Sequence, residues 1–356
     1  MSKPILAAIL SCQGYSLTDD EKYLFNKFNP LGITLFNRNI KDKKQVKSLI
    51  DSIKNTINRD DILIAIDEEG GRVQRLKNIN RHNYISAQNL ATLPIKYTKM
   101  HAELISSDLI EMGINVNYSP VVDRKINSTD SSVLEKRCFS DKDEEIVEFA
   151  TNMANTYINM GICPCIKHIP GHFNIAKDPH LNKIECDLSI DEIKNQIKYL
   201  KEFSKYPLAM TSHILLKSID DTYPVTLSSK IISKLIRDYL SFDGFLLSDA
   251  IDMKAISGNI IEKLNQSLDA GIDAVCYCSG EYKDLFAICN QKRFITEKSL
   301  IRFANIKKVI NNNRQEVDIK DIRKLYRTGI RKFANETYSY DATEVLHYMQ
   351  KKGDFK

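Results

Sequence analysis

The stretch ICPCIKHIPGH (Ile162–His172) joins a short apolar run to a cluster of ionisable side chains. Continuous apolar runs of this length are typical of strands that are buried on both faces of a parallel sheet. The run ends at Lys167 and His168, a Pro-Gly pair follows, and Asp178 and His180 come soon afterwards. Titratable groups gathered in a turn-rich segment indicate a chemical site, with one or two packing histidines as the alternative.

Other short apolar runs of the chain have the same character, and longer amphipathic, charged segments separate them. The runs are Ile5–Leu10, Gly32–Phe36, Ile62–Ile66, Ile114–Tyr118, Ile162–Ile166, Leu208–Thr211, Phe245–Leu247 and Ile272–Tyr277. Buried strands that alternate with helices predict an α/β chain folded as a (β/α)8 barrel of the TIM type. The alternative is an open doubly wound sheet, which is disfavoured because no G-x-G-x-x-G follows the first run.

Helix signals lie between and after these runs. Thr18 with Glu21, and Ser189 with Glu192, have the spacing of capping boxes, and the second precedes a predicted helix over Ile193–Phe203. Two amphipathic helices are predicted beyond the last run, over Glu297–Val309 and Val317–Phe333. We expect one domain over residues 1–356, with the barrel at about residues 4–290 and a helical C-terminal extension at about residues 291–356.

A barrel places catalytic groups where its strands end. Ionisable side chains end several of the runs, and they are Asp67, Asp123, Lys167, His168, His213 and Asp249. The alternative is that any strand exit tends to be polar, but that would yield Ser, Thr and Asn as readily as Asp, His and Lys. The bias therefore predicts a site at the carboxyl ends of the strands.

Composition restricts the partners of the chain. The net charge is +5, from 51 basic and 46 acidic residues that are interspersed, so no nucleic-acid surface is predicted. No apolar run reaches the length of a membrane span. The run from Pro4 to Leu10 faintly resembles a lipoprotein signal, but it is short for one, and a buried strand is preferred.

The chain has eight cysteines and no clear secretion signal, which favours reduced thiols and a cytoplasmic protein. Cys163-x-Cys165 and Cys276-x-Cys278 could suggest a metal site. However, this spacing places small apolar side chains on one face of a strand, and the C-x2-C spacing of zinc sites is absent. We expect no metal and no other cofactor.

Three segments carry candidate chemistry. Asp249 can act as a nucleophile or a cation stabiliser, or else as a helix N-cap. Pro179 favours an extended Asp178, so Asp178 and His180 point the same way and can form an acid–base pair, unless this is an ordinary surface loop. The segment Asp67–Arg75 places acids and arginines around a Gly-Gly turn, which suits a hydroxyl-rich ligand better than a solvated charge run.

Together these motifs resemble those of glycoside hydrolase family 3. Ile66–Arg75 is similar to its I-D-x-E-G-G-R-V-x-R element, and Ser248–Met253 is similar to S-D-D-L-x-M, whose first Asp is the nucleophile. Lys167–His172 with Asp178-x-His180 resembles the K-H-F-P-G-H-G…D-S-H element of the β-N-acetylglucosaminidase branch. Further agreement, within a resemblance that runs from about residue 14 to 280, comes from Leu35–Asn39, Asn117–Asp123, Arg137 and Met210–Ile214.

The resemblance implies a retaining exo-β-N-acetylglucosaminidase that removes terminal N-acetylglucosamine from cell-wall muropeptides, as cytoplasmic, single-domain family members do. It implies that Asp249 is the nucleophile and that His180, oriented by Asp178, is the acid/base. It also implies that the sugar is held by Asp67, Arg75, Arg137, Lys167 and His168. The expected partner is a small carbohydrate or muropeptide, and the expected state is a monomer without nucleic-acid or membrane partners.

The chain departs from the family pattern at several positions. Phe173 stands where Gly is usual, Pro179 where Ser is usual, and Ala250 replaces the second Asp of S-D-D. Leu134–Arg137 replaces an I-G-x-R pattern. None of these changes removes a residue with an implied chemical role. Alternatives that stay open are another family 3 exo-β-glycosidase, a phosphorylase, and a non-catalytic sugar-binding relative.

Overall fold

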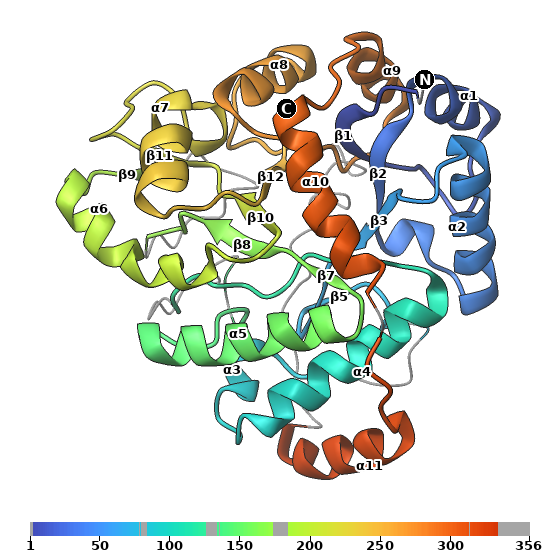
Figure 1. Cartoon of the computed structure of the whole chain (residues 1–356), viewed down its shortest axis with the longest axis vertical. Coiled ribbons are helices and arrows are strands. Elements are labelled where there is room, and N and C mark those ends of the chain that lie inside the picture. Colours follow the sequence, from blue (N-terminus) through green and yellow to red (C-terminus); the bar gives the residue numbers. More distant parts are fainter. Residues whose placement is uncertain are drawn as a thin grey trace, which may run out of the picture.

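The computed structural model describes residues 3–77, 79, 84–125, 134, 136–173, 184–312 and 314–333. Its main sheet is parallel, with strand order β7-β6-β3-β2-β1-β13-β12-β10-β8. The two edge strands, β7 and β8, come from one run of the sequence, and the amide of Val122 donates to the carbonyl of Lys167 (2.6 Å) beside them. The sheet therefore curls almost into a closed ring, and the predicted (β/α)8 TIM-type fold is confirmed (Figure 1).

Each predicted apolar run contributes to this ring. The strands are β1 (Leu6–Ser11), β2 (Pro30–Leu35), β3 (Leu63–Ile66), β6 (Val116–Asn117), β7 (Cys163–Pro164), β8 (Ile166–Ile169), β10 (Leu208–Thr211), β12 (Phe245–Ala250) and β13 (Ala274–Cys276). The fifth run is divided into β7 and β8. The strands are continuous apolar runs because both faces of the sheet are buried.

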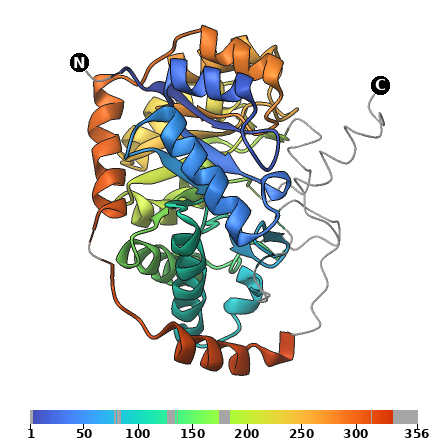
Figure 2. The same ribbon diagram turned by 90° about the vertical axis from the view of Figure 1, so that its right-hand side faces the viewer.

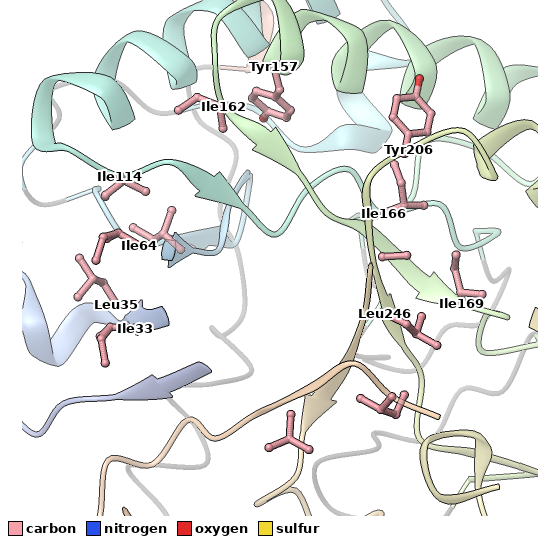
Figure 3. Packing of buried hydrophobic residues seen from close by; sticks show 14 of the residues in the cluster. Ile33, Leu35, Ile64, Ile114, Tyr157, Ile162, Ile166, Ile169, Tyr206 and Leu246 are labelled. Atoms are coloured by element: carbon pink, nitrogen blue, oxygen red, sulfur yellow. The ribbon is translucent and has the colours of Figure 1, made fainter. Parts of the chain in front are cut away.

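Alternate side chains of each strand enter two different cores. Leu63 and Ala65 point into the barrel, whereas Ile64 and Ile66 pack outward under the helices. Figure 3 shows this outer core between strands and helices, with Ile64, Ile166 and Leu246 among its labelled side chains. In the observed register, Gly32 of β2 pairs with Leu63 of β3 and Leu35 pairs with Ile66, so these neighbouring strands end at the same level.

Helices surround the ring. They are α1 (Asp19–Phe28), α2 (Lys43–Ile57), α3 (Ala87–Leu90), α4 (Lys96–Met112), α5 (Asp143–Asn159), α6 (Ile190–Ile197), α7 (Ser229–Ile231), α8 (Ile260–Ala270) and α9 (Tyr282–Asn290). Both predicted capping boxes are present, at Thr18 before α1 and at Ser189 before α6. The helix predicted over Ile193–Phe203 is α6 followed by a 3-10 segment, Lys198–Phe203. No helix of the described residues is both long and apolar enough to cross a membrane.

Both helices predicted over Glu297–Val309 and Val317–Phe333 are present, after α9. α10 (Glu297–Ile310) lies across the amino ends of the strands, where Phe303 and Ile306 enter the interior core (Figure 1). α11 (Ile319–Gly329) lies beside α4 at the edge of the molecule, as both views show (Figures 1 and 2). It is shorter than predicted because the Asp318 side chain caps its first turn, and a 3-10 turn replaces its predicted end. Since α10 closes one end, the open end of the barrel is the carboxyl end of the strands.

Two small sheets lie beyond the carboxyl ends. β4 (Glu68–Gly70) and β5 (Val73–Gln74) form a hairpin directly after β3. β9 (Ile184–Cys186) pairs in parallel with β11 (Ile214–Leu216), which follows β10. Both additions extend the barrel at the end where the ionisable residues are gathered.

Candidate active site

The candidate active site lies at the carboxyl ends of β3, β8 and β12. Asp67 directly follows β3, Lys167 and His168 belong to β8, and Asp249 lies near the end of β12. The Asp67 and Asp249 side chains are 17% and 21% exposed, whereas that of Lys167 is only 3% exposed. The mouth of the barrel therefore offers two carboxylates to a ligand and keeps the cations beneath them.

A charged cluster joins most of the residues predicted to hold a sugar. Lys167 Nζ lies 2.7 Å from Asp67 Oδ1 and 2.6 Å from Glu69 Oε1. The Arg137 guanidinium grips both Glu69 oxygens, with distances of 2.9 Å from Nε and 2.8 Å from Nη2. Arg75 Nη2 lies 3.6 Å from Asp67 Oδ2. We call Asp67, Glu69, Arg75, Arg137 and Lys167 the charged cluster.

Electrostatics favour the charged forms of Glu69 and Lys167 in this cluster. Burial opposes ionisation of Glu69, but the adjacent cations of Arg137 and Lys167 hold its pKa well below the usual range. Burial likewise opposes the charge on Lys167, yet Asp67 and Glu69 raise its pKa. A buried ion pair of this kind is costly to break, because removal of one partner leaves the other uncompensated. The cluster is therefore a rigid set of donors and acceptors.

The local backbone explains how the hairpin carries these groups. Gly70 has a φ of +94°, and a Cβ there would lie 2.5 Å from the Ile85 carbonyl oxygen, so the turn requires glycine as predicted. The buried Glu68 accepts the backbone N–H groups of Arg75 (2.8 Å) and Leu76 (3.0 Å) through Oε2. Burial raises the pKa of Glu68 to about 8, although these bonds act in the opposite direction. Glu68 thus holds the backbone of Arg75 and Leu76, directly after the hairpin.

A second cluster is centred on Asp123. Its Oδ2 accepts the backbone N–H (3.1 Å) and Nδ1 (2.7 Å) of His168, and its Oδ1 accepts the same two groups of His172 (both 3.0 Å). Burial opposes ionisation of Asp123, but the two histidines hold its pKa well below its usual range. Burial lowers the pKa of His168. Asp123 therefore fixes both rings, and the Nε2 of His168 is directed away from it.

Asp249 is placed by its own strand and by its neighbours. Its Oδ1 accepts the N–H of Ala250 at 2.7 Å, and the Nε2 of His168 lies 3.9 Å from its Oδ2. His213 bonds the Ala250 carbonyl through Nε2 (3.0 Å) and Thr226 Oγ1 through Nδ1 (2.8 Å). Burial lowers the pKa of His213, so a neutral ring holds the residue that follows Asp249.

Among the described residues, the side chains of Asp123, His168 and His172 could together hold a metal ion, because their ligand atoms lie within 4.8 Å of one another. A metal ion among them would have to displace the protons that both Nδ1 atoms share with Asp123. Cys163, Cys165 and Cys276 pack inside the barrel, and burial raises the pKa of their thiols.

The structure thus brings together Asp67, Arg75, Arg137 and Lys167 in one cluster, and His168 with Asp249 beside it. Asp178 and His180 lie outside the described residues. Sequence reasoning missed the linking role of Glu69, for which its place in I-D-x-E-G-G was the available signal. It named Asp123 as a strand exit and as the last residue of the family-like stretch Asn117–Asp123, but assigned it no role.

Comparisons with known proteins show which family the chain belongs to. Residues 10–321 match the family model described as the glycosyl hydrolase family 3 N terminal domain. The chain belongs to glycoside hydrolase family 3. This family 3 enzyme is 30% identical, over 260 residues, to a "Beta-hexosaminidase" of Shewanella frigidimarina, a match that covers 70% of this chain and 74% of that protein. It is 26% identical over 281 residues to a "Beta-hexosaminidase" of Haemophilus influenzae, covering 76% and 79% of the two chains.

A solved structure shares the fold. It is that of NagZ from Neisseria gonorrhoeae in complex with N-trifluoroacetyl-D-glucosamine. The TM-score is 0.77 at 22% identity, and the match covers 92% of this chain and 97% of that one. This likeness agrees with the barrel described above.

Proposed function

We propose that this family 3 enzyme is a retaining exo-β-N-acetylglucosaminidase. Its substrates would be cell-wall muropeptides that carry a terminal non-reducing N-acetylglucosamine on 1,6-anhydro-N-acetylmuramic acid. The observation that carries the proposal is the partly exposed carboxylate of Asp249 at the barrel mouth, beside the charged cluster. Support also comes from the two relatives named beta-hexosaminidase and from the glucosamine derivative in the NagZ complex.

The charged cluster suits the hydroxyl groups of one sugar. The Asp67 carboxylate is exposed enough to accept from hydroxyls, while Lys167 and Arg75 lie within reach of Asp67 and can donate. Arg137 is linked to Lys167 through the Glu69 carboxylate, which pairs with both side chains. Hydrogen bonds to charged groups are stronger than those between neutral groups, so one terminal ring can be held firmly. His168 would contact the sugar between this cluster and Asp249.

The reaction would proceed in two displacements. Asp249 attacks the anomeric carbon while the glycosidic bond breaks, and His180 gives its proton to the leaving oxygen. His180 then takes a proton from water, whose oxygen attacks the same carbon and releases Asp249. Asp178 would orient the imidazole and fix its tautomer. A His–Asp pair here replaces the second carboxylate that most retaining glycosidases use.

The enzyme would act in the cytoplasm, as a monomer, on a small carbohydrate or muropeptide. It would need no metal and no other cofactor, because a carboxylate supplies the nucleophile and an imidazole acid/base supplies the required proton transfers.

The direct test compares two aryl substrates. The enzyme is assayed on an aryl β-N-acetylglucosaminide and on the matching aryl β-glucoside, each with and without inorganic phosphate. The proposal predicts release from the N-acetylglucosaminide without need for phosphate. Preference for the glucoside would indicate another family 3 exo-β-glycosidase. Formation of a sugar 1-phosphate would indicate a phosphorylase, which a histidine acid/base permits because it does not repel phosphate. Binding of the sugar without turnover of either substrate would indicate a non-catalytic relative.

A further inference from the structure

The C-terminal helix α11 sends one side chain into the body of the barrel. α11 lies beside α4 in both views (Figures 1 and 2). Its Tyr326 is 2% exposed, whereas Leu325, the next residue along the chain, is 55% exposed. The Tyr326 ring lies against the rings of Tyr84 and His101, with centroids 6.4 Å and 5.8 Å away. An outlying helix therefore has a buried contact point close to the candidate site.

Hydrogen bonds continue from that point toward the charged cluster. The Nε2 of His101 lies 3.3 Å from the backbone carbonyl of Glu69, and its Nδ1 lies 2.6 Å from the Tyr326 hydroxyl. A carbonyl oxygen only accepts, so Nε2 must carry the proton of the neutral ring. Nδ1 is then an acceptor, and the Tyr326 hydroxyl donates to it. The direction of both bonds is fixed from the helix to the hairpin.

His101 also forms the wall behind the Gly-Gly turn. A Cβ on Gly70 would lie 2.8 Å from His101 Cε1, which shows how closely the ring approaches the backbone there. The residue before that turn is Glu69, whose carboxylate holds Arg137 and Lys167. Any change in the position of the Glu69 backbone therefore moves the group that pairs with both cations.

We propose that Tyr326 and His101 are positioning residues, through which α11 supports the sugar-binding side chains from behind. The proposal rests on the proposed function in one respect, namely that Arg137 and Lys167 hold the sugar. A substrate held by these side chains in both the ground state and the transition state should lose affinity without losing turnover when the support is removed.

A matched pair of variants separates this role from simple packing. Tyr326→Phe removes the hydroxyl that bonds His101, whereas Tyr84→Phe removes the neighbouring hydroxyl that donates to Asp108 (2.5 Å). Both variants keep their ring, and each deletes a hydrogen bond to a buried partner. Only the first interrupts the connection to Glu69.

The kinetic experiment measures KM and kcat of both variants on the aryl β-N-acetylglucosaminide. We expect Tyr326→Phe to raise KM about 3- to 10-fold, the equivalent of one hydrogen bond, with kcat little changed. Tyr84→Phe should leave KM unchanged, although both variants should lower the melting temperature by similar amounts. His101→Leu should raise KM as well, and adding Tyr326→Phe to it should have no further effect. Equal KM changes in the two tyrosine variants, or none in Tyr326→Phe, would overturn the proposal.

A second readout does not depend on activity. Hydrogen–deuterium exchange of the peptide that covers residues 67–76 should quicken in Tyr326→Phe and stay unchanged in Tyr84→Phe. If the wild-type enzyme does not cleave the N-acetylglucosaminide, the proposed function fails, and the exchange experiment still decides the positioning role. Unchanged exchange in Tyr326→Phe would show that α11 does not hold the hairpin.

Discussion

The Nε2 of His168 lies 3.9 Å from Oδ2 of Asp249, while its Nδ1 is bonded to Asp123 at 2.7 Å. His168 thus stands between a fully buried carboxylate and a partly exposed one. Because Nδ1 of His168 donates its hydrogen bond to Asp123, the Nε2 atom nearest Asp249 can accept a hydrogen bond from a substrate hydroxyl without a change of protonation. This relationship ties the end of β8 to the end of β12, which is where the proposed function places the sugar.

Arg75 provides a test of sugar binding. Arg75→Ala should lower the affinity for substrate and for N-acetylglucosamine-type inhibitors by about 1–3 kcal/mol, the scale of a hydrogen bond to a charged group. Inhibition constants and kcat/KM of the variant provide the measurement, and Arg331→Ala, on a 3-10 turn after α11, is a control. If neither quantity changes in Arg75→Ala, its guanidinium does not contact the sugar.

The proposed acid/base can be tested with leaving groups of different quality. His180→Ala should slow cleavage of a natural disaccharide far more than that of a dinitrophenyl glycoside, because a good leaving group needs no proton. Azide should partly restore the second step, since it attacks without help from a base. Asp178→Ala should show the same pattern in milder form. Equal slowing on good and poor leaving groups would remove His180 from this role and make His168 and His172 the next candidates.

His101 should make the stability of the enzyme depend on pH. Burial lowers its pKa from the usual 6.5 to about 4. Between these two pH values His101 binds a proton in the unfolded chain but not in the folded chain. The free energy of unfolding that neutral His101 contributes is therefore fully present above about pH 6.5 and is lost as the pH falls toward 4. The loss amounts to about 3 kcal/mol over the whole window.

Urea unfolding of wild type and His101→Gln across this window measures the effect. The variant should lose less of its free energy of unfolding than the wild type does, by about 2–3 kcal/mol between about pH 7 and about pH 4.5. The difference between the two proteins isolates His101 from other buried groups that titrate in the same range, such as Glu68. Parallel curves for the two proteins would show that His101 is not buried in neutral form.

Chelation tests the absence of a metal requirement. Since the proposed chemistry uses side chains alone, exhaustive treatment with EDTA should leave kcat/KM unchanged. Loss of activity that one particular metal ion restores would contradict this prediction. The group formed by Asp123, His168 and His172 would then be the place to look for the ion among the described residues.

The fold could be predicted from the sequence because it depends on local signals. Apolar runs such as Leu63–Ile66 are buried on both faces, and the charged residues that end several of these runs mark the mouth of the barrel. The same signal located Asp67, Lys167 and Asp249. The role of Glu69 could not be read in this way, because it depends on how the hairpin turns its carboxylate inward toward Arg137.

The contact of Tyr326 with His101 could not be predicted from the sequence either. These residues are 225 positions apart, and only the docking of α11 on α4 brings them together. In the sequence, Tyr326 is one apolar position of an amphipathic helix, and nothing distinguishes it from a residue that simply packs. Long-range polar contacts of this kind follow from tertiary structure and leave no local pattern.

The most direct test of the proposed mechanism is to trap its covalent intermediate. A 2-fluoro sugar with a good leaving group should inactivate the enzyme and add one sugar to the peptide that contains Asp249. Asp249→Ala, with its fold intact by circular dichroism, should lose turnover and remain unlabelled. A sugar found instead on Asp252 or Asp67, or an active enzyme that is never labelled, would contradict Asp249 as the nucleophile of a retaining glycosidase.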